Sequence, residues 1–204
     1  MEKNLKRMAT MHKMQVTGLE LFYKQGFYTT SIDDILKELN LSKGAFYYHF
    51  KSKEDFFISI LQTLVVRKVY SMLIEPIEGH ENPLELISSC IEEALQTAEH
   101  NENDFGFVLS NFMNEFNGKH PEIMKYLNDM LKIWEVNLVS ALQKGKFNGF
   151  VDRHVDCEGV ASYIISSFIG IRTLMVEGSP TALRYRYMQQ LRFYFRAMAH
   201  RQPA

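Results

Sequence analysis

The chain has 204 residues, of which 46% are hydrophobic, and its formal net charge is −1. That length suits one or two globular domains with a buried core. Because the net charge is close to zero, it gives no support for a polyanionic partner. The charge is, however, unevenly distributed along the chain. Residues 1–53 carry nine basic and five acidic side chains, whereas the remainder carries 14 and 19. A basic N-terminal part on an acidic chain favours contact with nucleic acid at that end.

The sequence gives little reason to expect export or membrane insertion. Residues 1–18 lack the continuous apolar segment of a secretory signal, and the most apolar run, 160–171, is too short to cross a bilayer. Two lone cysteines, Cys90 and Cys157, form no disulfide framework and suit a reducing compartment. We therefore expect a cytoplasmic protein without a membrane partner.

In chain order, the first predicted helix covers residues 5–25, because its apolar side chains recur at helical spacing, and it ends at Gly26. The next helix begins after Ser31, a good N-cap with Asp34 three residues later, as in a capping box. Helices of about eight residues are not stable alone in water. The first helix is therefore expected to cover the short ones that follow.

A tight turn is expected at Asn40, because Asn tolerates the left-handed backbone conformation that ends many helices. Ser42 then caps a short helix over residues 43–49, and Ser52 starts another. Two short helices joined by a tight turn form a helix-turn-helix by spacing. In such motifs the second helix enters the major groove of DNA.

The second helix of this motif has side chains suited to DNA. Lys43 and Gly44 open it with donors and bare backbone, and Ala45 is small enough to contact a thymine methyl group. We expect these three residues to meet base edges. Contacts to phosphate are expected from Thr30, Ser31, Tyr47, Tyr48, His49 and Lys53. Composition alone leaves a helical hairpin with a solvated polar face almost equally open.

From Gly26 to Phe57 the chain resembles the N-terminal DNA-binding domain of the tetracycline-repressor (TetR) family. The resemblance lies in the segments GFYTTSIDDI and LSKGAFYYHFKSKEDF. One departure is Asn40, where the family usually has Gly, and both residues tolerate the same backbone region. The resemblance implies a transcriptional regulator that binds an operator.

The rest of the chain also predicts helices, and no segment alternates like a strand. We expect an all-α fold of about nine helices, with an N-terminal three-helix helix-turn-helix domain and a C-terminal ligand-binding and dimerisation bundle. The domains are placed at residues 1–51 and 52–204. The later helices are expected at residues 52–74, 83–101, 105–117, 121–146, 156–177 and 181–200.

The C-terminal helices are rich in aromatic and Met side chains, which suit a cavity for varied apolar ligands. For most of these positions a packed core is the simpler interpretation. The predicted ligand contacts are Phe105, Phe107, Asn111, Phe112, Met113, Trp134, Tyr163, Ser167 and Phe168. A filled core would favour a protein-docking scaffold, and a cavity of several hundred Å³ would favour a small-molecule sensor.

Residues 107–170 also resemble, more loosely, the ligand-sensing domain of a TetR branch tied to drug efflux or electrophile detoxification. The segments are SNFMNEF, QKGKFNGF and VASYIISSFIGIRTLM. Electrophile sensors of that branch carry a cysteine near the start of the sixth helix, where this chain reads NDFGFVLS, so noncovalent binding is expected. The resemblance also implies a homodimer through the helices at 156–177 and 181–200. Apolar residues expected there are Leu183, Tyr187, Leu191, Tyr194 and Phe195.

The sequence contains no motif of an enzyme class that we recognise. Its seven histidines are scattered without metal-ligand spacing, and phosphate-binding or dinucleotide-binding glycine loops are absent. We therefore expect no catalytic site, metal or cofactor. The favoured hypothesis is a TetR-type repressor released from a palindromic operator by a small apolar or aromatic effector. The alternative is a DNA-bound scaffold that docks a protein partner.

Overall fold

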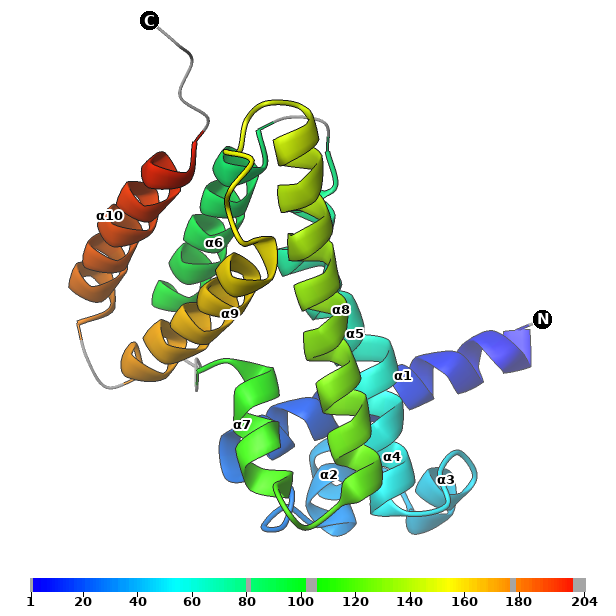
Figure 1. The fold of residues 1–204 in the computed structure, drawn as a ribbon. Coiled ribbons are helices and arrows are strands. Elements are labelled where there is room, and N and C mark those ends of the chain that lie inside the picture. Colours follow the sequence, from blue (N-terminus) through cyan, green and yellow to red (C-terminus); the bar gives the residue numbers. More distant parts are fainter. Residues whose placement is uncertain (1, 80–81, 102–105, 177–178, 200–204) are drawn as a thin grey trace, which may run out of the picture. The chain divides into compact units, whose positions relative to one another are not determined.

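The computed structural model of the protein describes residues 2–79, 82–101, 106–176 and 179–199. Within these ranges the chain is helical, with an isolated bridge between Val151 and Ala199 and no β-strand (Figure 1). The elements are α1 (Glu2–Gln25), α2 (Ile32–Leu39), α3 (Lys43–Tyr47), α4 (Lys53–Ile60), η1 (Leu61–Val65), α5 (Val66–Leu73), η2 (Glu75–Ile77), α6 (Pro83–Glu99), α7 (Val108–Phe116), α8 (Pro121–Phe147), α9 (Cys157–Leu174) and α10 (Pro180–Met198). The predicted all-α fold is confirmed. The described ranges hold about the predicted nine helices if α4, η1 and α5 count as one.

Helix α4 continues through η1, a π-helical turn, into α5. Among the described residues, the helical run Lys53–Ile77 is long and apolar enough to cross a bilayer by length and composition alone. Core helices of soluble proteins meet the same criterion. In this run Phe56, Phe57, Ile60 and Leu61 are fully buried within the protein.

The chain divides into two compact units. The first comprises Met1–Lys68 with Asn111–Asn128, and the second comprises Val69–Ser110 with Asp129–Ala204. The C-terminal part of α7 and the start of α8 therefore belong to the same unit as the helix-turn-helix. The domain division expected from the sequence is a single cut after residue 51, whereas each of these units combines two separate stretches of the chain. That division stays a prediction.

The first unit has an aromatic core. Rings from α1, α3, α4 and α7 meet with centroids 4.7 to 6.0 Å apart, within the range of favourable edge-to-face and tilted pairs. The buried members are Phe22, Phe27, Phe46, Phe50, Phe56, Phe57, Phe112 and Phe116. Gly18 permits the close approach of α1 and α4, because a Cβ there would lie 2.6 Å from the Phe56 ring. This core positions the helix-turn-helix.

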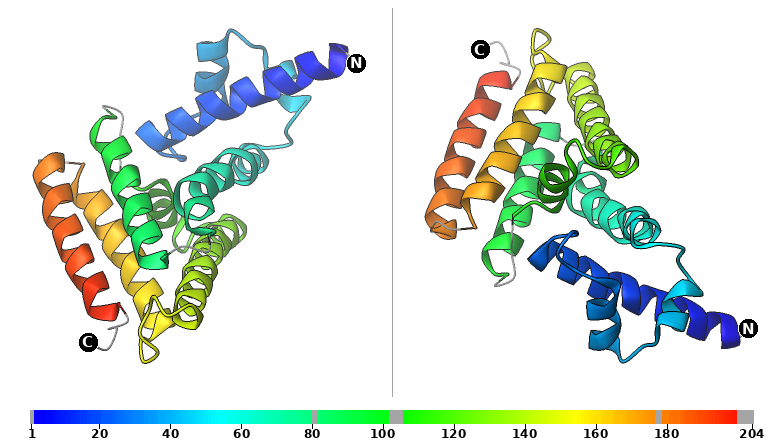
Figure 2. Two further views of the ribbon diagram at one scale, coloured as in Figure 1. Left: turned by 90° about the horizontal axis from the view of Figure 1, so that it is seen from above. Right: turned by 90° about the horizontal axis from the view of Figure 1, so that it is seen from below.

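In the second unit, α10 lies alongside α6 and α9 (Figure 2). Arg184 of α10 pairs with Glu99 of α6 at 2.6 Å and with Glu92 at 3.6 Å. The α8–α9 connection is hydrogen-bonded to the end of α10, where the Asp152 amide donates to the Met198 carbonyl at 2.9 Å. Cys90 lies within this unit, where its thiol donates to the Met72 carbonyl at 2.9 Å and burial raises its pKa to about 12.

Candidate nucleic-acid interface

The start of α2 is fixed by the predicted capping box. The Ser31 hydroxyl accepts from the Asp34 amide at 3.1 Å, and the Asp34 carboxylate accepts from the Ser31 amide at 2.8 Å. A second bond joins the Ser31 hydroxyl to the same carboxylate at 2.6 Å. These hydrogen bonds lower the pKa of Asp34. They satisfy orphan amides at the helix N-terminus and orient α2.

The turn after α2 is also as predicted. Asn40 has φ 51° and ψ 42°, and among the described non-glycine residues it alone has positive φ. The Leu41 amide returns to the Leu36 carbonyl at 3.0 Å. This left-handed cap ends α2 and directs the chain into α3.

Helix α3 is anchored from one side and exposed on the other. The Ser42 hydroxyl accepts from the Ala45 amide at 3.3 Å. Phe46 is fully buried and meets Phe56 at 5.3 Å between ring centroids. On the opposite side Tyr47 and Tyr48 are 57% and 66% exposed. Two tyrosines this exposed are available to a polar partner such as DNA phosphate.

Lys43, the first residue of α3, reaches back to α2. Its ammonium group lies 2.9 Å from an Asp33 carboxylate oxygen, and both side chains are exposed. Hydrogen bonding to Asp33 raises the pKa of Lys43. An exposed pair of this kind adds little stability. Lys43 is therefore charged at neutral pH and can exchange Asp33 for another acceptor.

Gly44 has no side chain, so its backbone is exposed beside Lys43. A Cβ built there would meet only the Ser42 hydroxyl oxygen, at 3.7 Å, which is ordinary contact. Packing within the protein therefore does not require glycine at this position. The missing side chain instead leaves room for another surface to approach the α3 backbone.

The N-terminal part of α1 lies beside α3, and together they form a depression of about 540 Å³. Its lining comprises Lys6, Arg7, Thr10, Gly44, Ala45, Tyr48 and His49. The Arg7 guanidinium lies 5.3 Å from the centre of the Tyr48 ring. Burial, and secondarily the Arg7 charge, lower the pKa of His49. The depression thus adds two basic residues of α1 to the helix-turn-helix surface.

Two other predicted phosphate contacts differ in their surroundings. Lys53 begins α4, with its ammonium group 4.3 Å from the centre of the Phe27 ring, and partial burial lowers its pKa. Thr30 is fully buried, and its hydroxyl donates to the Gly26 carbonyl at 2.8 Å. Of the nine predicted residues, Gly44, Ala45, Tyr48 and His49 therefore line one depression, whereas Thr30 is buried.

Three of the predicted ligand contacts meet in the second unit. The Trp134 ring centre lies 6.1 Å from that of Phe107 and 5.6 Å from that of Phe168. Phe107 and Phe168 are 5.3 Å apart, and all three side chains are buried. These rings form an aromatic cluster that joins α8, α9 and the segment just before α7.

The remaining predicted ligand contacts lie elsewhere. On α9, Tyr163 packs against Tyr194 at 4.7 Å between centroids, and the Ser167 hydroxyl lies 3.0 Å from that of Tyr187. Both contacts face α10. In the first unit Phe112 packs against Phe57, and Asn111 and Met113 lie beside it on α7. Phe105 lies outside the described residues.

The residues that the sequence assigns to a dimer interface on α10 divide into two groups. Leu191 and Phe195 are buried inside the protomer. Leu183, Tyr187 and Tyr194 are partly buried. The outward apolar side chains of α10 are instead Tyr185 and Phe193. The helical spacing of the apolar residues in α10 did not by itself show which of its two apolar faces packs inside the protomer.

Comparison with known protein families covers both parts of the chain. Residues 16–60 match the family model for bacterial regulatory proteins of the tetR family. Residues 83–190 match the model for a tetracyclin repressor-like C-terminal domain. Both matches are to regulators, and neither indicates an enzyme. Among the described residues no group of three or more His, Cys, Asp and Glu is arranged to hold a metal.

Individual relatives support the same assignment at different lengths. The uncharacterized HTH-type transcriptional regulator YerO of Bacillus subtilis (strain 168) is 54% identical over 43 residues, which cover 21% of this chain and 15% of YerO. The match to this relative is therefore confined to a small part of its length. The HTH-type transcriptional repressor DhaR of Mycobacterium sp. (strain GP1) is 22% identical over 155 residues, or 75% of each chain.

A solved structure shows the same fold over nearly the whole chain. The crystal structure of a TetR transcriptional regulator from Chloroflexus aurantiacus J-10-FL superimposes with a TM-score of 0.85. The alignment covers 97% of this chain and 99% of that one at 22% sequence identity. At this identity the similarity concerns the fold.

Proposed function

Because the chain belongs to the TetR family of bacterial transcriptional regulators, we propose that it represses transcription as a homodimer on a palindromic operator. A small apolar or aromatic ligand would release it. The observation that carries the proposal is the exposed start of α3, where bare backbone at Gly44 lies between Lys43 and Ala45. We place the protein in the cytoplasm, where the DNA is.

The proposed contacts follow from the chemistry of this surface. Lys43, Gly44 and Ala45 would meet base edges, since the first residues of the second helix reach furthest into a major groove. Phosphates would be held by Ser31, Tyr47, Tyr48, His49 and Lys53, with Lys6 and Arg7 of α1 beside them. Thr30 is buried and would contribute indirectly, by fixing the turn that leads into α2.

Dimerisation would use the outward faces of α9 and α10. On α9 the small residues Ser162, Ser166 and Gly170 are exposed at four-residue intervals, and a Cβ at Gly170 would meet nothing within 4 Å. Leu174 of α9 and Phe193 of α10 are also exposed. Covering such a surface with a second copy would bury apolar area and place two α3 helices about one two-fold axis.

The effector site is proposed at the aromatic cluster of Phe107, Trp134 and Phe168. The three rings are packed against one another, so an apolar ligand would have to separate them. A ligand that favours the separated arrangement would shift the protein toward that state. If that state spaces the two α3 helices differently, the operator would be released. A scaffold that docks a protein partner is not favoured by the relatives found.

The proposal is tested by selecting bound duplexes from a random DNA pool with the full-length protein. We expect an inverted repeat whose half-sites are about one helical turn apart, bound by a dimer. A library of apolar and aromatic compounds is then screened for release of the selected duplex. A monomer that enriches no inverted repeat would refute the DNA part. An operator complex that no compound releases would refute the effector part alone.

A further inference from the structure

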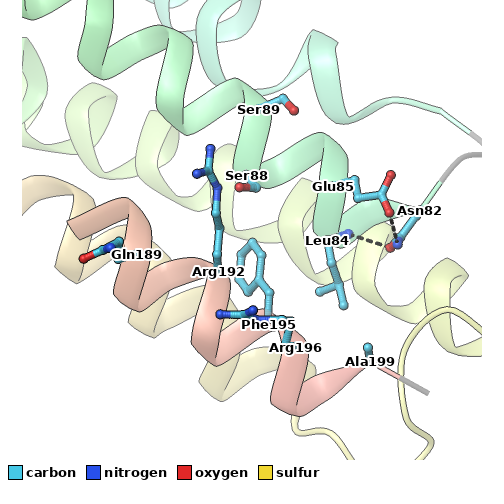
Figure 3. Close-up of a pocket in the computed structure, with 10 residues that line it drawn as sticks. All are labelled: Asn82, Leu84, Glu85, Ser88, Ser89, Gln189, Arg192, Phe195, Arg196 and Ala199. Atoms are coloured by element: carbon cyan, nitrogen blue, oxygen red, sulfur yellow. Dashed lines mark hydrogen bonds between the residues drawn. The ribbon is translucent and has the colours of Figure 1, made fainter. Parts of the chain in front are cut away.

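A groove of about 670 Å³ runs along the seam between α6 and α10 in the second unit. Figure 3 shows Arg192 and Phe195 projecting from α10 toward α6, and Leu84 and Ser88 on the facing side of α6. The groove is within the size range of small-molecule sites. It does not include the proposed effector cluster of Phe107, Trp134 and Phe168.

Ion pairs close the seam on one side of this groove. Glu99 and Glu92 of α6 are seven residues apart and therefore face the same side of the helix. Glu99 pairs with Arg184 at 2.6 Å, and Glu92 pairs with both Arg184 and Arg192. The pairing advances toward the start of α6 as α10 runs toward its end, so the two helices are antiparallel.

Seven residues further toward the start of α6, the corresponding ion pair is missing. Glu85, seven residues before Glu92, instead accepts a hydrogen bond from the Asn82 amide group at 3.0 Å. Arg196, one turn after Arg192, has no carboxylate within ion-pairing distance in the part of the chain that the structure describes. Among the described residues, the Arg196 guanidinium thus lines the groove without an ion pair, and the Glu85 carboxylate, held by Asn82, lines the same groove.

The groove also offers apolar surface and a further donor. Leu84 and Phe195 line it with the few apolar atoms that stay accessible, since Leu84 is 4% and Phe195 5% exposed. The Ser88 hydroxyl makes no hydrogen bond with another described residue. Arginine recognises carboxylate and phosphate through paired N–H groups, so the missing partner should be an anion.

We propose that this groove binds an amphipathic anion, with a carboxylate or phosphate head against Arg196 and Ser88 and an apolar body over Leu84 and Phe195. The ligand would bridge α6 and α10. This site is independent of the proposed effector cluster. On α10 the groove side carries Arg192 and Arg196, whereas the face proposed for dimerisation carries Phe193.

The proposal is tested with the full-length protein and four probes: decanoate, decyl phosphate, decanol and inorganic phosphate. Binding is measured by calorimetry and located by amide chemical shifts. We expect decanoate or decyl phosphate to bind and to shift Ser88 and Arg196, and decanol and inorganic phosphate to bind at least tenfold more weakly. The better of the two anions identifies the head group. Decanol binding as tightly as decanoate would overturn the proposal.

Matched substitutions separate the groove from a general effect of charge. Arg196→Gln should weaken binding of the preferred anion about tenfold, because it removes one charge-assisted contact. Arg186→Gln removes an exposed charge from α10 outside the groove lining and should leave the affinity unchanged. Equal losses in the two variants, or shifts confined to the Trp134 cluster, would overturn the proposal. The DNA selection described above does not depend on this result.

Discussion

The ammonium group of Lys53 lies over the ring of Phe27, 4.3 Å from its centre. Phe27 in turn packs against Phe57 at 5.2 Å and against Phe116 at 4.9 Å. The position of this cation is therefore set by the aromatic core of the first unit. A lysine held in this way loses less side-chain freedom on meeting a phosphate than a solvated one would.

Replacement of Lys53 should weaken binding to every duplex to a similar extent. In Lys53→Ala one phosphate contact is lost, so the slope of log affinity against log salt concentration should fall by about 0.9. Fluorescence anisotropy at several salt concentrations, with operator and unrelated DNA, measures this. Lys68→Ala, on the same helical run, serves as the control and should leave the slope unchanged. An unaltered slope in Lys53→Ala would remove Lys53 from the interface.

Substitution of Gly44 should separate folding from DNA binding. Because a Cβ there meets only Ser42, Gly44→Ala should leave the protein as stable or raise its stability by about 0.5 kcal/mol. The same methyl group would hinder close approach to DNA, and operator affinity should fall about tenfold. Thermal unfolding and DNA titration of one preparation test both effects. Unchanged operator affinity would show that Gly44 does not approach the duplex.

The caps of α2 and α3 were predictable because they depend on neighbours in sequence. Ser31 and Asp34 are three residues apart, and Ser42 reaches an amide three residues on. The left-handed turn at Asn40 likewise follows from the conformational tolerance of one residue. Such local features need no knowledge of the tertiary structure.

Other features required the packed structure. Thr30 is as polar in sequence as Ser31, but it is buried because its hydroxyl bonds to the Gly26 carbonyl. Arg7 is far from Tyr48 in sequence, and only the packing of α1 beside α3 brings them together. The groove at Arg196 was equally hidden, because it arises from a register between α6 and α10 that no local pattern contains.

The backbone at Asn40 provides a stability prediction. Asn40→Ala should destabilise the protein by about 1 kcal/mol, because a Cβ residue without a short polar side chain is disfavoured in the left-handed region. Asn40→Gly should be neutral or slightly stabilising. Chemical denaturation of the three proteins orders them. If Ala and Gly proved equally stable at this position, the turn would not depend on left-handed backbone.

The capping box predicts a specific loss of stability in acid. Because Ser31 lowers the pKa of Asp34 in the folded state, the carboxylate stabilises the fold above the unfolded Asp pKa of about 3.9. This contribution is lost as pH falls through the lowered folded value. The stability difference between wild type and Asp34→Asn should therefore be largest near neutral pH and shrink below about pH 4.

Two comparisons test the origin of that effect. Ser31→Ala should cost about 1 kcal/mol and should itself reduce the pH dependence, because it removes the hydroxyl that bonds to Asp34. Asp33→Asn, at the neighbouring exposed carboxylate, should retain the wild-type acid profile of the Asp34 step. A constant difference between wild type and Asp34→Asn from neutral to acid pH would contradict the assignment.

Trp134 is the chain's single tryptophan and is buried between Phe107 and Phe168, so its fluorescence reports on the proposed effector site. A compound that releases operator DNA by separating these rings should change the intensity or wavelength of Trp134 emission over the concentration range that causes release. Phe168→Leu should alter the compound's affinity while leaving DNA binding without the compound intact. If release occurs with no change in emission, the ring cluster is not the effector site. An anionic effector that instead loses potency in Arg196→Gln would place the coupling at the α6–α10 groove, because the Arg196 guanidinium lines that groove.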